Sequence, residues 1–144
     1  MTLKTINYTS DYGYTLERAH EHDAGMDIRS AVTKVLIPGG RYSFPTGIHI
    51  DIPPGYEVQV RSRSGLSLKN GIAVLNAPGT LDAGYTGEVC VILHNPSLDA
   101  YTVQKGDKIA QLVVKPVETP TPMLQTTIDV DTERGDNGFG STGK

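Results

Sequence analysis

Alternation of apolar and polar side chains gives the first predicted elements of this chain. Residues 56–61, Tyr-Glu-Val-Gln-Val-Arg, alternate with the period of two that a half-buried strand requires. Residues 88–93 and 108–114 are rich in β-branched side chains, which favour strands. These three segments therefore predict extended structure.

Glycine and proline divide the remaining sequence into short pieces. The 16 glycines and 9 prolines leave no stretch longer than twelve residues free of both, so there is little room for long helices. Clusters of turn residues separate the predicted strands at residues 38–40, 53–55, 76–79 and 105–107. Only residues 64–69 have the character of a short helix. The pattern predicts an all-β fold, a jelly roll, sandwich or distorted barrel of short strands with little helix.

Length and charge limit the classes of function. A chain of 144 residues predicts a single domain with a sizeable core. Its 13 basic and 16 acidic side chains give a net charge of −3, which argues against stable nucleic-acid binding and against a membrane-surface protein. No apolar run approaches the length of a membrane span. We expect a soluble protein that is cytoplasmic or otherwise intracellular.

The single cysteine, Cys90, adds little chemistry. It cannot form an intrachain disulfide, and without a cluster of histidines and cysteines it does not indicate a zinc site. Its neighbours are Val89, Val91 and Ile92. We therefore expect Cys90 to be a small side chain in the core.

Residues 134–144 form a glycine-rich segment, Arg-Gly-Asp-Asn-Gly-Phe-Gly-Ser-Thr-Gly-Lys. Its arginine can pair with phosphate, its phenylalanine can stack on a base, and its hydroxyls and amides can bind oxyanions. The simpler interpretation is a disordered tail. Residues 138–144 also have the glycine and lysine frame of a P-loop, but the strand and helix that such a loop needs are not predicted around it. The adhesion tripeptide at 134–136 is short enough to recur by chance.

Two internal segments carry polar groups that a strand does not need. Asp27 stands between two apolar residues, and facing inward it would require a charged partner or a metal, whereas facing outward on an edge strand it would be ordinary. Residues 61–65, Arg-Ser-Arg-Ser-Gly, could offer guanidinium, hydroxyl and amide donors to a polyphosphate. Ser64 would equally serve as the N-cap of the short helix.

A third polar segment, residues 76–88, predicts a long loop or hairpin that enters the next strand at Glu88. Asp82 in this segment can act as a general base toward water, and Tyr85 can lie against a sugar or a base. The alternative is that Asp82 caps a turn while Tyr85 covers the edge of the core.

Together these segments resemble, in order and spacing, the five motifs of the trimeric deoxyuridine triphosphatases, the dUTPases. The matching segments are residues 24–27 (Ala-Gly-Met-Asp), 63–66 (Arg-Ser-Gly-Leu), 76–88, 106–112 and 134–143. The resemblance implies a β-jelly roll and a homotrimer whose active sites each use three subunits. Residues 1–130 would form the domain, and residues 131–144 a flexible arm that completes the active site of a neighbouring subunit.

The resemblance also implies a reaction, which is hydrolysis of dUTP to dUMP and pyrophosphate. Such an enzyme limits uracil incorporation into DNA and supplies dUMP for dTMP synthesis. Asp82 matches the acid that activates the attacking water, and Asp27 matches the acid that holds Mg²⁺ through water. The implied substrate contacts are Arg63, Ser64, Gly65 and Gln111 at the phosphates, Asn76, Gly79, Thr80, Leu81 and Tyr85 at the base and sugar, and Arg134, Phe139, Gly140, Ser141 and Thr142 in the arm.

Three positions depart from the family pattern. Gly84 stands where many members carry a second acid, Asn137 replaces a common glycine, and Met26 replaces a frequent aromatic or other apolar residue. None of them removes a motif acid, a phosphate ligand or the stacking ring.

Two alternatives remain beside the dUTPase. One is a dCTP deaminase, which shares the fold but needs an added acid and basic partners at the base. The other is a dUTP-binding regulatory protein on the same scaffold, or an enzyme that also docks a protein partner, which the sequence does not identify.

Overall fold

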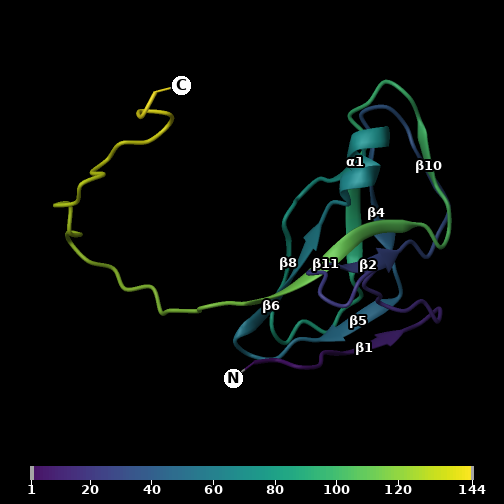
Figure 1. Cartoon of the computed structure of the whole chain (residues 1–144), viewed down its shortest axis with the longest axis horizontal. Coiled ribbons are helices and arrows are strands. Elements are labelled where there is room, and N and C mark those ends of the chain that lie inside the picture. Colours follow the sequence, from purple (N-terminus) through teal and green to yellow (C-terminus); the bar gives the residue numbers. More distant parts are fainter. Residues whose placement is uncertain (1, 144) are drawn as a thin grey trace.

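Two antiparallel sheets of unequal size form the body of the molecule (Figure 1). In this computed structural model, which describes residues 2–143, the larger sheet has the order β2 (Met26–Arg29), β11 (Lys108–Pro116), β6 (Tyr56–Arg61) and β8 (Gly79–Leu81). The smaller sheet has the order β4 (Arg41–Pro45), β9 (Cys90–His94) and β7 (Ala73–Val74). Two ribbons complete the fold, β1 (Asn7–Ser10) with β5 (Ile48–Asp51) and β3 (Lys34–Leu36) with β10 (Tyr101–Val103).

The strands agree with the all-β prediction. The alternating segment at residues 56–61 is strand β6, and the segments at 88–93 and 108–114 correspond to β9 and β11 with shifts of about two residues at the ends. Partners in the sheets are distant in sequence: β2 pairs with β11, and β4 pairs with β9.

One hydrophobic cluster fills the space between these strands. Its largest fully buried side chains come from both sheets and include Phe44 on β4, Leu93 on β9 and Leu112 on β11. Burial of such a side chain stabilises the fold by about 1.5–3 kcal/mol. Both sheets therefore depend on this shared core, because a single hairpin of these strands would not be stable by itself.

Strand β9 corrects the expectation for Cys90. Val91 and Leu93 are fully buried on one face, so alternation turns Cys90 to the other face, where it is exposed. Partial desolvation, and then the nearby Glu88 carboxylate, raises the pKa of the thiol. Cys90 is not a core residue, and the raised pKa disfavours its reactive thiolate form.

The short helix is present as α1 (Ser64–Asn70), but its N-cap differs from the prediction. Arg63, in an extended conformation, is the N-cap and makes no side-chain capping bond, while Ser64 lies inside the helix, so the N-cap interpretation of Ser64 was wrong. The helix ends at Gly71, whose φ of 70° needs a glycine and whose N–H donates to the Ser67 carbonyl at 2.9 Å. Within residues 2–143, no helix is long and apolar enough to cross a membrane.

The chain after β11 runs away from the sheets in Figure 1. Residues 117–143 contain no strand or helix, and their side chains are exposed almost throughout. Apolar side chains are among them, namely Met123, Leu124, Ile128 and Val130. This segment cannot contribute to the core of its own domain.

Candidate active site

Strand pairing in the larger sheet brings two motif residues face to face. Gln111 on β11 lies opposite Asp27 on β2 and, on its other side, opposite Arg61 on β6. Arg63 lies two residues beyond the end of β6 and is the N-cap of α1. The motifs at residues 24–27, 63–66 and 106–112 therefore meet at one end of the sheet.

Asp27 is held by two cations. Its Oδ1 lies 3.3 Å from the Nε of Arg63, and its Oδ2 lies 3.0 Å from the Nζ of Lys108. Arg63 also donates from Nη1 to the Lys108 carbonyl at 3.2 Å. The Asp27 side chain is only 17% exposed, so this pairing compensates the loss of water around the carboxylate. Both sequence interpretations of Asp27 hold in part: it lies on an edge strand, and it is charge-paired.

Gln111 is positioned by two features of its surroundings. Its Nε2 donates to the Ser62 carbonyl at 3.2 Å. Gly25 lies directly against the side chain, since a Cβ at Gly25 would be 3.0 Å from Cδ and 3.1 Å from Cβ of Gln111, and nearer still to Oε1. Only a residue without a side chain leaves room there for Gln111.

These groups surround an open cavity of about 360 Å³. Its walls combine acidic, basic, hydroxyl and amide groups and consist of Ala19, Asp23, Ala24, Gly25, Asp27, Arg63, Ser64, Gly65 and Gln111. Guanidinium, hydroxyl and backbone N–H groups are the donors that bind phosphate oxygens. The arrangement suits a polyphosphate whose charge is shared between cations and polar donors.

The segment around Asn76 lies at the opposite edge of the same sheet. Within the described part of the chain, residues 2–143, strand β8 (Gly79–Leu81) pairs only with β6, placing Gly79 opposite Val60 and Thr80 opposite Gln59. A Cβ at Gly79 would be 3.1 Å from the Val60 Cβ and 3.4 Å from the Asn76 Nδ2. The Asn76 amide therefore lies beside the backbone of β8, whose outer edge is unpaired in the sheet.

A tight turn follows β8 and carries Asp82 on its exposed side. The Tyr85 N–H donates to the Asp82 carbonyl at 3.1 Å, and Gly84 within the turn has φ 81°. Glycine adopts this left-handed conformation without the steric cost that a Cβ would add. The Tyr85 hydroxyl donates to the Glu88 carbonyl at 3.0 Å, and its ring covers Gly87.

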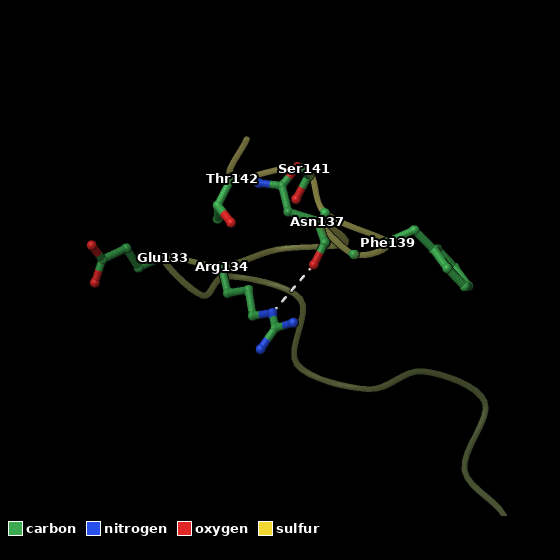
Figure 2. Close-up of a pocket in the computed structure, with 8 residues that line it drawn as sticks. Glu133, Arg134, Asn137, Phe139, Ser141 and Thr142 are labelled. Atoms are coloured by element: carbon green, nitrogen blue, oxygen red, sulfur yellow. Dashed lines mark hydrogen bonds between the residues drawn. The ribbon is translucent and has the colours of Figure 1, made fainter. Parts of the chain in front are cut away.

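The predicted arm residues lie apart from both groups. In Figure 2 the Arg134 Nε donates to the Asn137 carbonyl at 3.2 Å, and Phe139 points away from the segment. Phe139 is fully exposed and has φ 50°. Arg134, Gly140, Ser141 and Thr142 line a hollow formed by the arm alone. Lys144, the last residue of the P-loop frame, lies outside the described residues.

The predicted site residues thus form three separate groups, at the Asp27 cavity, at β8 with its following turn, and in the arm. Among residues 2–143, neither the segment 76–85 nor the arm lines the cavity at Asp27. Sequence reasoning missed two contributors, Lys108 and Gly25. Both stand inside recognised motifs, but only the folded structure shows that the Lys108 side chain reaches Asp27 and that Gly25 lies against Gln111.

Comparison with known proteins decides the family. The dUTPase family model matches residues 11–143. This chain belongs to the dUTPase family. The fold is accordingly the jelly roll of that family, as the sequence predicted.

Curated and solved dUTPases agree with this assignment. The chain is 54% identical to the deoxyuridine 5'-triphosphate nucleotidohydrolase of Ehrlichia canis (strain Jake), over 98% of this chain and 94% of that protein. The dUTPase of Staphylococcus bacteriophage 80alpha with dUpNHpp has a TM-score of 0.91 at 32% identity, covering 99% of this chain and 100% of the phage chain. A variant dUTPase of phage phi11 of S. aureus, described with a structural Mg(II) ion, has a TM-score of 0.80 at 29% identity, covering 87% of this chain and 99% of that one.

Proposed function

We propose that this protein hydrolyses dUTP to dUMP and pyrophosphate. The observation that carries the proposal is the cavity at Asp27, which gathers three separate motifs of a dUTPase-family chain around one set of phosphate-binding groups. The name and activity of its curated relatives support the same reaction.

The triphosphate binds at this cavity. Arg63 supplies a guanidinium, Ser64 a hydroxyl and Gly65 a backbone N–H, all of which donate to phosphate oxygens. Lys108 adds a second positive charge, 3.0 Å from Asp27. A substrate with several negative charges therefore meets two cations, Arg63 and Lys108, that also pair with Asp27.

The residues at the cavity fit a magnesium ion that is bound mainly by substrate and water. Among the described residues, no group of three His, Cys, Asp or Glu side chains could hold a metal by itself. Mg²⁺ keeps several waters and is usually bound by one or two carboxylates together with substrate phosphates. Asp27 is the carboxylate that would hold the hydrated ion, and Gln111 would bind one of its waters. When bound, the ion offsets the charge of the triphosphate.

Asp82 is the general base in this proposal. Its exposed carboxylate at the end of β8 takes a proton from water, which attacks the α-phosphorus in line with the departing pyrophosphate. General-base catalysis of this kind contributes about 10²–10⁴-fold to the rate.

The outer edge of β8 reads the base. Because β8 pairs with β6 on one side only, N–H and C=O groups of Gly79 to Leu81 on its other side can bind the polar edge of uracil. The Asn76 amide lies beside Gly79 and can donate and accept there. Tyr85, held by Glu88 and Gly87, presses on the deoxyribose and leaves no room for a 2′-hydroxyl.

A homotrimer with shared sites unites the three groups of residues. Asp27 and β8 lie on opposite edges of a four-stranded sheet, a separation of about 14 Å at normal strand spacing. One subunit then provides the phosphate cavity, a second provides β8 and Asp82, and a third provides the arm of residues 131–144. Phe139 stacks on uracil while Arg134, Ser141 and Thr142 meet the γ-phosphate. The solvent exposure of Phe139 supports this role, because among residues 2–143 nothing covers the ring.

Pyrophosphate release tests the proposal. Purified protein with magnesium is given dUTP, dTTP, dCTP or UTP at equal concentration, with Asp82→Asn as the control. Selective release from dUTP that depends on Asp82 is expected. Release that survives in Asp82→Asn would refute the base assignment, deamination of dCTP would indicate the deaminase, and binding of dUTP without hydrolysis would indicate a regulator.

A further inference from the structure

His49 lies between two hydrogen-bond acceptors, on a strand that no dUTPase motif includes. It is on β5, opposite Thr9 of β1. Its Nδ1 is 3.0 Å from the Thr86 carbonyl, and its Nε2 is 3.3 Å from the Oδ2 of Asp11. The ring therefore connects the end of β1 to the loop that follows Asp82.

Both contacts require a proton on the ring. A carbonyl oxygen only accepts, so Nδ1 must carry a hydrogen, and an ionised carboxylate only accepts, so Nε2 must carry one as well. Neutral imidazole has one N–H and can satisfy only one of the two partners. Only the imidazolium form of His49 makes both bonds.

The charged surroundings favour the same form. Asp11 acts on His49 from the turn after β1 and Glu88 from the loop before β9, while Asp51, at the next outward position of β5, and Tyr8 line the same cavity. The pKa of His49 is raised above its ordinary value, first by the hydrogen bond to Thr86, against an opposing effect of desolvation, and then by Asp11 and Glu88. The additional stability is therefore present in full below the unfolded pKa of about 6.5 and is lost as the pH rises through the folded value.

The loop that His49 holds carries a substrate-facing side chain. Thr86 follows Tyr85, whose hydroxyl donates to the Glu88 carbonyl. Glu88 is itself fixed, since its Oε1 accepts from the N–H groups of Gly47 at 2.8 Å and Thr46 at 3.1 Å. Among these attachments of the loop, the one through His49 is the one that changes with pH near neutrality, because the ring that loses its proton can no longer keep both of its bonds.

We propose that His49 is a positioning residue whose protonated form fixes the loop at residues 85–88, so that binding of dUTP and rejection of UTP weaken as the pH rises. The inference rests on the proposed function, because it assumes that Tyr85 contacts the sugar. Without the bond to Asp11 the His49 ring can rotate, and its hydrogen bond to the Thr86 carbonyl becomes weaker. One ordinary hydrogen bond corresponds to about a two- to tenfold change in binding, which is the size expected for KM. The rate constant kcat changes less, because His49 does not touch the reacting atoms.

The kinetic test compares wild type with His49→Gln between about pH 5.5 and pH 8.5, the range in which histidine titrates. Glutamine can still donate to Thr86 but cannot become charged. KM for dUTP should rise with pH in wild type, and the dUTP-to-UTP preference should fall, while both changes are missing in His49→Gln. His94→Gln, on β9, is the matched control and should keep the wild-type profile. Parallel profiles of wild type and His49→Gln would overturn the inference.

A second readout does not depend on catalysis. NMR titration of the His49 ring should give a pKa above the ordinary value, a lower one in Asp11→Asn, and a higher one when dUpNHpp is bound, because proton and ligand binding are reciprocally linked. An unchanged pKa on ligand binding would overturn the coupling even in an active enzyme. Absence of dUTP hydrolysis in wild type would instead refute the proposed function, and the pKa of the free protein would still show whether His49 holds the loop as described.

Discussion

Replacement of Gly25 by alanine tests how the phosphate cavity is built. The added Cβ would lie 3.0 Å from Cδ and 3.1 Å from Cβ of Gln111, and closer to Oε1. The φ of Gly25 is outside the left-handed region, so alanine introduces no backbone strain there. A loss of stability on this change must therefore come from the contact of the added Cβ with Gln111.

The expected loss of stability depends on how far Gln111 and its strand are displaced by the added Cβ. The amide end of Gln111 can swing away, which breaks its 3.2 Å bond to the Ser62 carbonyl at a cost of about 0.5–1.5 kcal/mol. The Cβ of Gln111 cannot rotate, so β2 and β11 must shift slightly as well. Together these effects should lower the free energy of unfolding by about 1–3 kcal/mol, as overpacking generally does. Displacement of Gln111 should reduce kcat/KM for dUTP by about 10–100-fold, the range for residues that orient a bound metal or its waters.

A double-mutant cycle in urea, at fixed protein concentration, isolates the contact. Gly25→Ala should be less destabilising in a Gln111→Ala background, where the contacts with the amide end are gone and only the 3.1 Å contact with the Cβ at position 111 remains, giving a coupling of about 1–2 kcal/mol between the two positions. Gly65→Ala is the control for stability, because its Cβ would meet nothing within 4 Å. An equal loss of unfolding free energy on Gly25→Ala in the wild-type and Gln111→Ala backgrounds would refute the packing argument.

Three further changes address the core, the turn and the arm. Leu93→Ala removes a fully buried side chain and should lower stability by about 2–5 kcal/mol in urea denaturation; a loss well under 1 kcal/mol would contradict the assigned core. Gly84→Ala places a Cβ on a residue with φ 81°, so the free energy of unfolding should fall by about 1 kcal/mol. The rate constant kcat should fall as well, because Asp82 lies in the same turn and would move. Unchanged kinetics would show that the conformation of this turn does not affect catalysis. Deletion of residues 134–144 should abolish activity but leave the trimer intact in sedimentation. Mixed with Asp82→Asn chains, the deleted chains should regain activity, and no regain after proven subunit exchange would exclude shared sites.

Much of the fold could be predicted because it depends on local pattern. The alternation at residues 56–61 gave β6 with both ends correct, and Gly71 ends α1 just after the predicted helical residues. Cys90 was misplaced because an apolar run does not show which of its faces is inward, and the burial of Val91 and Leu93 decides that. Ser64 was misplaced by one position, since Arg63 already has the extended backbone of an N-cap.

The sequence by itself determined the class of fold, the order of its motifs and the residue types available for binding phosphate, because periodicity, turn residues and motif spacing are local properties of the chain. Tertiary structure decided which of these residues meet. The register of β2 against β11 sets Asp27 between Arg63 and Lys108, and leaves space at Gly25 for Gln111. The pairing of β1 with β5 brings Asp11 to one side of His49, and the backbone bond from Val89 to Ile48 brings the loop with Thr86 to the other. These contacts join residues from 36 to 86 positions apart, and only the burial of a common core, to which every strand contributes a little, holds such distant positions in one register.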